Sequence, residues 1–326
     1  MIKIKIPSRR IEMKQYNFGI LSTSSIADRF VAALKESGVG RALAICSRNI
    51  QRAEKKAKEL GIERYYGDYQ SLVSDNDIDI VYVSTVNSEH YRWAREAILN
   101  GKHVLCEKPC TTSSESTLEL YELAQNRGVF FMEAQKMLFL PVWKRIKEIM
   151  ASGELGEARS FCASHSFPVS YNGWMLDKSL GGGPLLSSGI YAAELILWLF
   201  GDVDRLSAVF DLDGGEVERG YHISGITRSK VLFTFQNSTL VRLEDKAQIF
   251  CEKGSITVEN YWKAKSFTVK TQKGEESFCF DCDHELKYEI LHFTDCIEMG
   301  LKESPIVTKK LSCDGIRLLE KAKSQM

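Results

Sequence analysis

The sequence predicts an α/β Rossmann domain, a doubly wound parallel sheet, followed by an α+β domain with a large, mostly antiparallel open sheet. Three observations predict this. The 326 residues exceed what one hydrophobic core usually serves, apolar runs alternate with amphipathic helices from Tyr16 to Glu133, and the alternation stops near Ala134. We therefore expect a dinucleotide-binding domain over residues 1–134 and a substrate-binding and oligomerisation domain over residues 135–326, whose last helix returns toward the first domain.

Short apolar runs mark the strands of the first domain. The amphipathic segment after the first run places Ile26, Phe30 and Leu34 on one face, as a helix that packs on a sheet requires. Glycines such as Gly38 and Gly128 follow these segments, where helices end. The expected strands are Tyr16–Leu21, Ala42–Cys46, Arg64–Tyr66, Ile78–Ser84, His103–Cys106 and Val129–Met132.

Strand-like runs dominate the second half, which is typical of an antiparallel sheet. The expected strands are Ala158–Ser166, Asp204–Asp211, Lys230–Gln236, Ser238–Leu243 and Gln248–Glu252. The expected helices are Val142–Met150, Ser188–Phe200, Glu285–Gly300 and Cys313–Lys323. The alternating Val231, Phe233 and Phe235 are buried either inside this domain or between subunits, and we expect a homodimer or homotetramer formed through this sheet.

Composition limits the partners. Lys and Arg total 43 against 43 Asp and Glu, with no basic block, so the sequence indicates a small-molecule partner and no nucleic acid. No run of about 18 apolar residues and no signal-peptide pattern occurs, which predicts a cytoplasmic protein with no membrane partner. Nine scattered cysteines fit reduced thiols, and Cys279, Cys282 and His284 lack a fourth ligand, so no metal is expected.

The stretch HVLCEKP, from His103 to Pro109, ends an apolar run in charged residues. Ligands of open parallel sheets bind beyond the carboxyl ends of the strands, so Glu107 and Lys108 are expected to face the ligand crevice. The alternative is a charged pair that begins a solvated loop.

The turn after the first strand is rich in serine. A dinucleotide-binding turn usually reads G-x-G-x-x-G, and here Ser22, Ser24 and Ala27 occupy the three glycine positions. The hydroxyls and amides of this turn predict a phosphate site, and the alternative is an ordinary serine-rich helix cap. The expected phosphate-binding residues are Ser22, Thr23, Ser24, Ser25 and Ile26.

The second strand ends in Ser47 and Arg48, where a dinucleotide fold places the residue that meets the adenosine ribose. A carboxylate there would accept the ribose hydroxyls and repel a 2′-phosphate, whereas Ser47 and the Arg48 guanidinium suit that phosphate. The sequence therefore predicts NADP(H) as the preferred cofactor, with NAD(H) possible. The alternative is that Arg48 is a solvated loop residue.

Taken together, these motifs resemble the Gfo/Idh/MocA oxidoreductase family, in particular its dimeric dihydrodiol dehydrogenase and glucose-fructose oxidoreductase branch. The resemblance covers nearly the whole chain and rests on an ordered set of motifs: GILSTSSIA, YVSTVNSEHY, GKHVLCEKP, FMEA, GGGPLLSSGIY and ESPIVT. It implies that Thr85, Asn87 and His90 lie along the cofactor, with Glu107 and Lys108 beside its nicotinamide half and a cis bond between Lys108 and Pro109. A single histidine at a helix start is alternatively a cap or packing residue.

The segment GGGPLLSSGIY places Ser187 and Tyr191 four residues apart, on one face of a helix. In many relatives this spacing holds Asp and His, and in the dihydrodiol dehydrogenase branch a tyrosine serves as acid/base. The resemblance thus implies Tyr191 as the catalytic acid/base, and Tyr191 is alternatively a packed helix aromatic. Departures from the family pattern are Ser22, Ser24, Val86, Leu138 and Ser187, and they allow reduced cofactor affinity or turnover.

The leading hypothesis is an oxidoreductase that transfers a hydride between a nicotinamide cofactor and a sugar, diol or related carbonyl compound. Tyr191 would transfer the proton while the Lys108 ammonium lowers the pKa of the phenol and polarises the substrate oxygen. Ser187 and Trp174 would contact the substrate together with these two residues. The alternatives are a dinucleotide-binding protein with weak or no catalysis, such as a redox sensor or scaffold, and a pure interaction module.

Overall fold

The structure is a computed structural model that describes residues 2–4, 14–168 and 171–326. Its chain divides into two compact units, each built from separate stretches. The Rossmann unit comprises Arg9–Lys136 and His284–Cys313, and the large-sheet unit comprises Met1–Ser8, Met137–Asp283 and Asp314–Met326. The expected division into two consecutive domains therefore differs from this one, because residues 284–313 return to the first unit.

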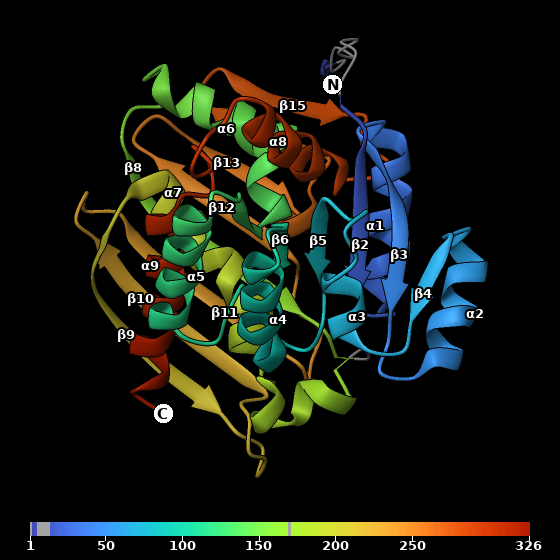
Figure 1. Ribbon diagram of the computed structural model, residues 1–326. Coiled ribbons are helices and arrows are strands. Elements are labelled where there is room, and N and C mark those ends of the chain that lie inside the picture. Colours follow the sequence, from blue (N-terminus) through green and yellow to red (C-terminus); the bar gives the residue numbers. More distant parts are fainter. Residues whose placement is uncertain (1, 5–13, 169–170) are drawn as a thin grey trace. The chain divides into compact units, whose positions relative to one another are not determined.

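A six-stranded parallel sheet forms the centre of the Rossmann unit (Figure 1). Its strand order is β4 (Arg64–Tyr66), β3 (Gly40–Cys46), β2 (Tyr16–Leu21), β5 (Ile80–Val83), β6 (His103–Glu107) and β7 (Phe131–Ala134). Every neighbouring pair is parallel. The chain order reverses between β2 and β5, and such a switch point is where open parallel sheets bind ligands.

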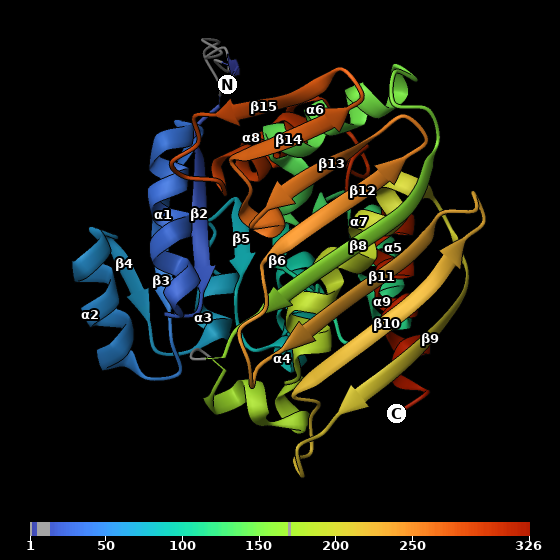
Figure 2. The same cartoon turned by 180° about the vertical axis from the view of Figure 1, so that it is seen from behind.

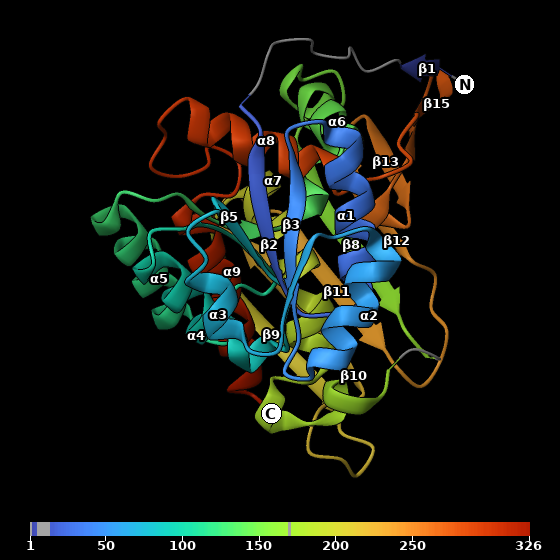
Figure 3. The same cartoon turned by 45° about the vertical axis from the view of Figure 1, so that its right-hand side comes forward.

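Helices cover both faces of this sheet. Figure 3 shows α1 and α2 on one side and α3, α4 and α5 on the other. Phe30 of α1 stacks on Tyr82 of β5 with ring centroids 3.7 Å apart. The helices are α1 (Ser25–Ser37), α2 (Ile50–Leu60), α3 (Tyr69–Val73), α4 (Asn87–Leu99), α5 (Ser114–Arg127) and α8 (Lys287–Glu298).

Helix α8 comes from far along the chain and packs against α1. Its Phe293 is fully buried and meets Phe130 edge to face at 5.2 Å, and Glu298 Oε1 accepts a hydrogen bond of 2.6 Å from the Tyr16 hydroxyl. Arg29 also pairs with Glu285 just before α8. This segment is therefore part of the core of the Rossmann unit.

The large-sheet unit contains a nine-stranded mixed sheet. Its pairs are antiparallel except β1 with β15 and β8 with β11. The predicted fold class, a Rossmann domain plus a mostly antiparallel open sheet, is confirmed. The strand order is β1 (Ile2–Ile4), β15 (Gly274–Phe280), β14 (Ser266–Thr271), β13 (Gly254–Glu259), β12 (Lys246–Cys251), β8 (Ala158–Ser166), β11 (Leu232–Ser238), β10 (Gly220–Thr227) and β9 (Val203–Asp211).

One face of this sheet carries the buried apolar side chains, whereas Figure 2 looks onto the opposite face, on which no helix lies among the described residues of this unit. Val231, Phe233 and Phe235 are buried within the chain itself, which favours the first of the two burial modes expected for them. The helices of this unit are α6 (Pro141–Ala151), α7 (Ile190–Phe200) and the larger part of α9 (Lys309–Lys323).

One expected strand is not a strand of its own, and several others have different bounds. Ser238–Leu243 is not a strand: Ser238 ends β11, and its hydroxyl accepts hydrogen bonds from the backbone N–H groups of Leu240 and Val241, which turns the chain away from the sheet. Strand β7 begins two residues later than expected, because the Val129 N–H bonds to the end of α5 instead. Strands β1, β10, β13, β14 and β15 have no counterpart among the expected strands.

The run Lys178–Phe200 is long and apolar enough to cross a membrane by length and composition alone. However, 78% of its most apolar window is buried inside the protein. It is therefore a helix of the protein core, although no apolar run of about 18 residues was expected from the sequence.

Candidate functional site

Polar residues follow the carboxyl ends of five adjacent parallel strands in the Rossmann unit. Ser47, Ser22 and Thr85 follow β3, β2 and β5, and Lys108 and Lys136 follow β6 and β7. Glu107 pairs in register with Ala134, so Lys108 and Lys136 leave the sheet side by side. These residues share the edge where a parallel sheet binds its ligand.

The serine-rich turn bends sharply after β2. Ser22 has a φ of 118°, a conformation that glycine adopts without strain, and this is why the usual motif has glycine here. The Ser22 hydroxyl accepts from the Ser24 N–H at 3.1 Å and so supports the turn.

The N-terminus of α1 is not capped by a side chain, because the Ser24 hydroxyl donates to the Ser84 carbonyl oxygen instead. The first-turn N–H groups of Ser25 and Ile26 therefore suit an anion, as a pyrophosphate site needs. Thr23 lies half-buried between them and the strand.

After β3, Ser47 is buried and its hydroxyl accepts from the Asn49 N–H at 3.3 Å, whereas Arg48 is exposed. No carboxylate follows this strand directly. The neighbouring Asp68 caps α3 by accepting from the Ser71 N–H at 2.7 Å. The positive charge of Arg48 and the position of both residues thus fit a phosphorylated ribose. The Ser47 hydroxyl, however, already accepts a hydrogen bond within its own turn.

His90 links two loops at this edge. Its ring nitrogens lie 2.8 Å from the Pro109 carbonyl oxygen and 3.0 Å from that of Thr85, and burial lowers its pKa. Asn87 is also buried. The expected contact of His90 with a cofactor remains a prediction. It is not favoured here, because both ring nitrogens already contact backbone carbonyl oxygens.

Glu107 is held in place before Lys108 reaches the edge. The Tyr82 hydroxyl donates to Glu107 Oε1 at 2.5 Å, and Oε2 accepts from the Lys108 N–H at 3.2 Å. Tyr82 is fully buried, and burial together with the Glu107 charge raises its pKa well above the ordinary value. Lys108 itself is half-buried, and its bond to Pro109 is cis.

A buried group of charges beside this motif was not predicted from the sequence. Lys136 is only 4% exposed, and burial and the Lys108 charge lower its pKa to about 7. Glu289 of α8 is fully buried, neither of its carboxylate oxygens bonds to a residue that the structure describes, and burial and Glu107 raise its pKa. Lys136 was recognisable as the lysine just past a strand end in FMEAQK, whereas nothing near Glu289 in the sequence points to this edge.

In the large-sheet unit the glycine turn is shaped by a distant carboxylate. A Cβ at Gly183 would lie 2.4 and 2.8 Å from the Glu218 carboxylate oxygens, and the Gly183 φ is 105°. Glu218 Oε1 accepts from the Leu185 N–H at 2.7 Å, and burial raises the pKa of this carboxyl. Glycine is therefore required here by Glu218, which the sequence analysis did not identify.

The turn continues into a π-helical segment, Leu185–Gly189, before α7 begins. Tyr191 is 5% exposed, its ring centroid is 6.3 Å from that of Trp262, and Ser187 donates back to the Gly183 carbonyl oxygen at 3.0 Å. Insertions of this kind are common at functional sites. Trp174 is half-buried in the short helix Gly173–Leu176, and no contact joins it to Tyr191 among those found in the described residues.

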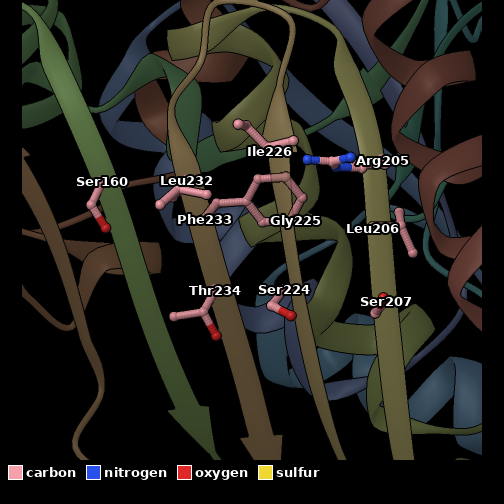
Figure 4. Close-up of a pocket in the computed structure, with 10 residues that line it drawn as sticks. All are labelled: Ser160, Arg205, Leu206, Ser207, Ser224, Gly225, Ile226, Leu232, Phe233 and Thr234. Carbon is pink, nitrogen blue, oxygen red and sulfur yellow. The ribbon is translucent and has the colours of Figure 1, made fainter.

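A separate hollow lies on the open face of the large sheet (Figure 4). Ser160, Leu232 and Thr234 line it from β8 and β11, and Arg205 and Ser224 line it from β9 and β10. It contains none of the residues expected to act in catalysis.

Comparisons with known proteins match both parts of the chain. A family described as "Oxidoreductase family, NAD-binding Rossmann fold" matches residues 16–135, and one described as "GFO/IDH/MocA C-terminal domain" matches residues 143–257.

Two curated relatives and two solved structures are among the most similar. Trans-1,2-dihydrobenzene-1,2-diol dehydrogenase from Mus musculus is 28% identical over 89% of this chain and 90% of its own length. D-xylose 1-dehydrogenase (NADP(+)) 2 from Haloferax volcanii is 37% identical over 59% of each chain. A 3-ketoreductase from Actinomadura kijaniata, solved with NADP and TDP-benzene, has a TM-score of 0.87 at 24% identity, covering 96% of this chain and 98% of its own. Levoglucosan dehydrogenase, solved with NADH and levoglucosan, has a TM-score of 0.87 at 17% identity and covers 96% and 97%.

Proposed function

Because the chain belongs to the Gfo/Idh/MocA family of NAD(P)-binding oxidoreductases, whose members include sugar and diol dehydrogenases, we propose that it oxidises or reduces a CH–OH or carbonyl group of a sugar, diol or related compound. Two observations support this proposal: a lysine lies at the ligand edge of the Rossmann sheet, and the large-sheet unit holds a buried tyrosine after its glycine turn. The 3-ketoreductase named above was also solved with a tyrosine replaced by phenylalanine and with a lysine replaced by alanine.

We assign the cofactor to residues that fit it. The uncapped first turn of α1, with Ser22, Thr23, Ser24, Ser25 and Ile26, would hold the pyrophosphate. Thr85, Asn87 and Glu107 would lie along the rest of the cofactor, and the nicotinamide ring supplies or accepts the hydride when bound.

Tyr191 moves the proton at the substrate oxygen, and Lys108 assists it. In this proposal the ammonium lowers the pKa of the phenol toward the working pH, where a group serves best as a general acid or base, and it also polarises the substrate oxygen. Ser187 and Trp174 contribute contacts to the substrate.

The test is an absorbance assay with reduced cofactor and a panel of aldoses, ketoses and dicarbonyls. Tyr191→Phe should reduce turnover by about 10²- to 10⁴-fold while cofactor affinity is unchanged. Tyr65→Phe, at an exposed position, is the matched control and should retain wild-type turnover. Full activity of Tyr191→Phe would refute the assigned role, and dinucleotide binding without turnover on any carbonyl would favour a sensor or scaffold.

We further propose NADP(H) as the preferred cofactor, because Arg48 is exposed beside the expected ribose position and no carboxylate opposes it. The protein is proposed to act in the cytoplasm. Equal dissociation constants for NADPH and NADH in a fluorescence titration would remove the cofactor preference.

A homodimer or homotetramer is proposed to form through the open face of the large sheet. Leu232 is 58% exposed and Phe250 is 40% exposed, and both pair in register with Ser160 of β8, so they flank the same position. Apolar side chains grouped on an exposed sheet face are typical of an interaction surface. Light scattering after gel filtration measures the oligomeric state.

A further inference from the structure

The two edges of the large sheet differ in length. Strand β1 at one edge has three residues, whereas β9 at the other edge has nine and contains no proline. Among the residues that the structure describes, no strand pairs with the outer side of β9, and Figure 2 shows this strand at the margin of the sheet. A long edge strand offers a row of free N–H and C=O groups to another strand, and proteins commonly shorten or cover such edges.

A glutamine side chain covers the middle of this edge. Gln325 follows α9, which ends at Lys323, and its Oε1 accepts a hydrogen bond of 2.9 Å from the Ala208 N–H. Its Nε2 donates to the Leu206 carbonyl oxygen at 3.4 Å. The carboxamide therefore takes the place that a peptide group of a neighbouring strand would have. Because Gln325 is exposed, the same two backbone groups can exchange it for water or for another strand at little cost.

These hydrogen bonds show which backbone groups of β9 point outward. The N–H and C=O groups of successive residues alternate between the two sides of a strand, so Leu206, Ala208 and Phe210 present theirs at the free edge. The Asp211 carbonyl oxygen points the other way, into the sheet, where it accepts a hydrogen bond of 2.7 Å from the Arg219 N–H. A strand that docks on this edge must therefore bond to the even-numbered residues of β9.

The sequence of β9, VDRLSAVFD, is complementary to a second copy of itself. When two copies run antiparallel about Ala208, Leu206 of one lies opposite Phe210 of the other, and these positions exchange backbone hydrogen bonds. Arg205 then lies opposite Asp211 of the second copy, at a position without backbone bonds, where facing side chains are closest. Two-fold symmetry repeats this pair, so opposite charges meet twice.

Other centres of symmetry lose this match. Pairing about Ser207 would place Arg205 opposite Val209 and would bring Asp204 opposite the aromatic ring of Phe210. Arg205 is exposed on the open face, where it lines the hollow in Figure 4, so its guanidinium is available at the surface. Charge complementarity therefore favours the register centred on Ala208.

We propose that the outer edge of β9 is a docking site for a second copy of this chain, paired antiparallel about Ala208, and that Gln325 competes with this pairing. The two occupants exclude each other, because both use the Ala208 N–H and the Leu206 carbonyl oxygen. This edge is distinct from the interface proposed for the open face. A two-fold contact through the open face joins only two copies, and a tetramer needs a second contact, which the β9 edge supplies.

The first experiment measures hydrogen exchange by mass spectrometry over residues 203–211 at several protein concentrations. Leu232→Asp is present throughout, so that association through the open face is removed. Adding Gln325→Ala should make exchange in this segment slow down as concentration rises, with a dissociation constant about tenfold lower than that of the Leu232→Asp parent, because the competing side chain is gone. Gln272→Ala, at an exposed glutamine of the β14–β15 turn, is the matched control and should behave like the parent.

Exchange that is independent of concentration in the Gln325→Ala variant would overturn the proposal, whether the edge stays open or another segment of the same chain covers it. If exchange slows only when a different protein is added and never between copies, the proposed occupant is wrong. Neither outcome depends on enzymatic activity, so the proposed oxidoreductase function stands or falls separately.

The second experiment tests the register by charge reversal, with association measured by analytical ultracentrifugation. In the chain that carries both Leu232→Asp and Gln325→Ala, Arg205→Asp places like charges opposite each other twice and should weaken association about tenfold. Adding Asp211→Arg should restore the dissociation constant to within about threefold. Arg242→Asp, at an exposed loop position, is the control and should leave association unchanged. Failure of the double reversal to restore association would contradict pairing about Ala208.

Discussion

Replacing Gly183 by alanine tests whether Glu218 shapes the turn that leads to Tyr191. The added Cβ would lie 2.4 and 2.8 Å from the two carboxylate oxygens of Glu218, closer than any van der Waals contact allows. The carboxylate has to move, and its hydrogen bond of 2.7 Å from the Leu185 N–H is then lost.

The expected cost has two parts. Placing alanine at a φ of 105° costs about 1–2 kcal/mol, as for other left-handed conformations. Breaking a buried hydrogen bond to a carboxylate costs about 1.5–3 kcal/mol. The sum predicts that Gly183→Ala lowers the free energy of unfolding by about 2.5–5 kcal/mol.

Urea unfolding followed by tryptophan fluorescence measures this change in the large-sheet unit, because four of the five tryptophans, Trp143, Trp174, Trp198 and Trp262, belong to that unit. Gly214→Ala is the matched control: its φ is 70° and no atom lies within 4 Å of the added Cβ, so only the conformational part, about 1–2 kcal/mol, is expected.

A double-mutant cycle isolates the clash. When Glu218→Ala is already present, Gly183→Ala should cost about 1–3 kcal/mol less than it does in the wild type. Equal costs for Gly183→Ala and Gly214→Ala, or strict additivity in the cycle, would refute the assigned role of Glu218.

Three further predictions concern cofactor, charge and assembly. Arg48→Ala should weaken NADPH binding by about 10- to 100-fold and leave NADH binding within about twofold in fluorescence titrations, and equal losses for both would contradict contact with a 2′-phosphate. Lys136 has a folded pKa of about 7 against an ordinary value near 10.5, so the unfolded chain holds one more proton between these pH values, and wild-type stability should rise with pH by up to about 1.4 kcal/mol per unit. Lys136→Met lacks this rise, so the free energy of unfolding of the wild type, measured with urea, should increase relative to that of the variant between pH 7 and pH 9. Parallel pH profiles of the two proteins would show that Lys136 stays protonated. Leu232→Asp should halve the mass measured by light scattering without loss of secondary structure by circular dichroism, and an unchanged mass would exclude this face from the interface.

The buried strands of the parallel sheet could be predicted because each is a short, continuous apolar run between helical segments. Strand β2 has the expected bounds, and β6 is one residue longer than expected, since Glu107 still pairs with Ala134. The start of β7 could not be predicted, because Val129 is as apolar as a strand residue but its N–H completes the end of a helix. Local hydrophobicity carries no information about that competition.

Some residues of the candidate site could likewise be predicted from the sequence, and others could not. Lys108 was predictable because a charge directly after a buried strand reaches the ligand edge. Glu218 and Glu289 were not, because their importance comes from partners far away in sequence: the turn at Gly183 for one, and the surroundings of Glu107 for the other. The sequence shows that residue 183 is a glycine, but it does not show that the Glu218 carboxylate lies where a side chain at this position would be.

The return of helix α8 to the Rossmann unit has a consequence for how the protein is made. A fragment ending at residue 136 would leave Phe130 without Phe293 and Tyr16 without Glu298, so a truncated chain should aggregate instead of giving an isolated nucleotide-binding half. During synthesis on the ribosome, the first sheet cannot complete its core until nearly the whole polypeptide has emerged. A Rossmann unit that folds on its own would require a designed linker between residues 14–136 and residues 284–313.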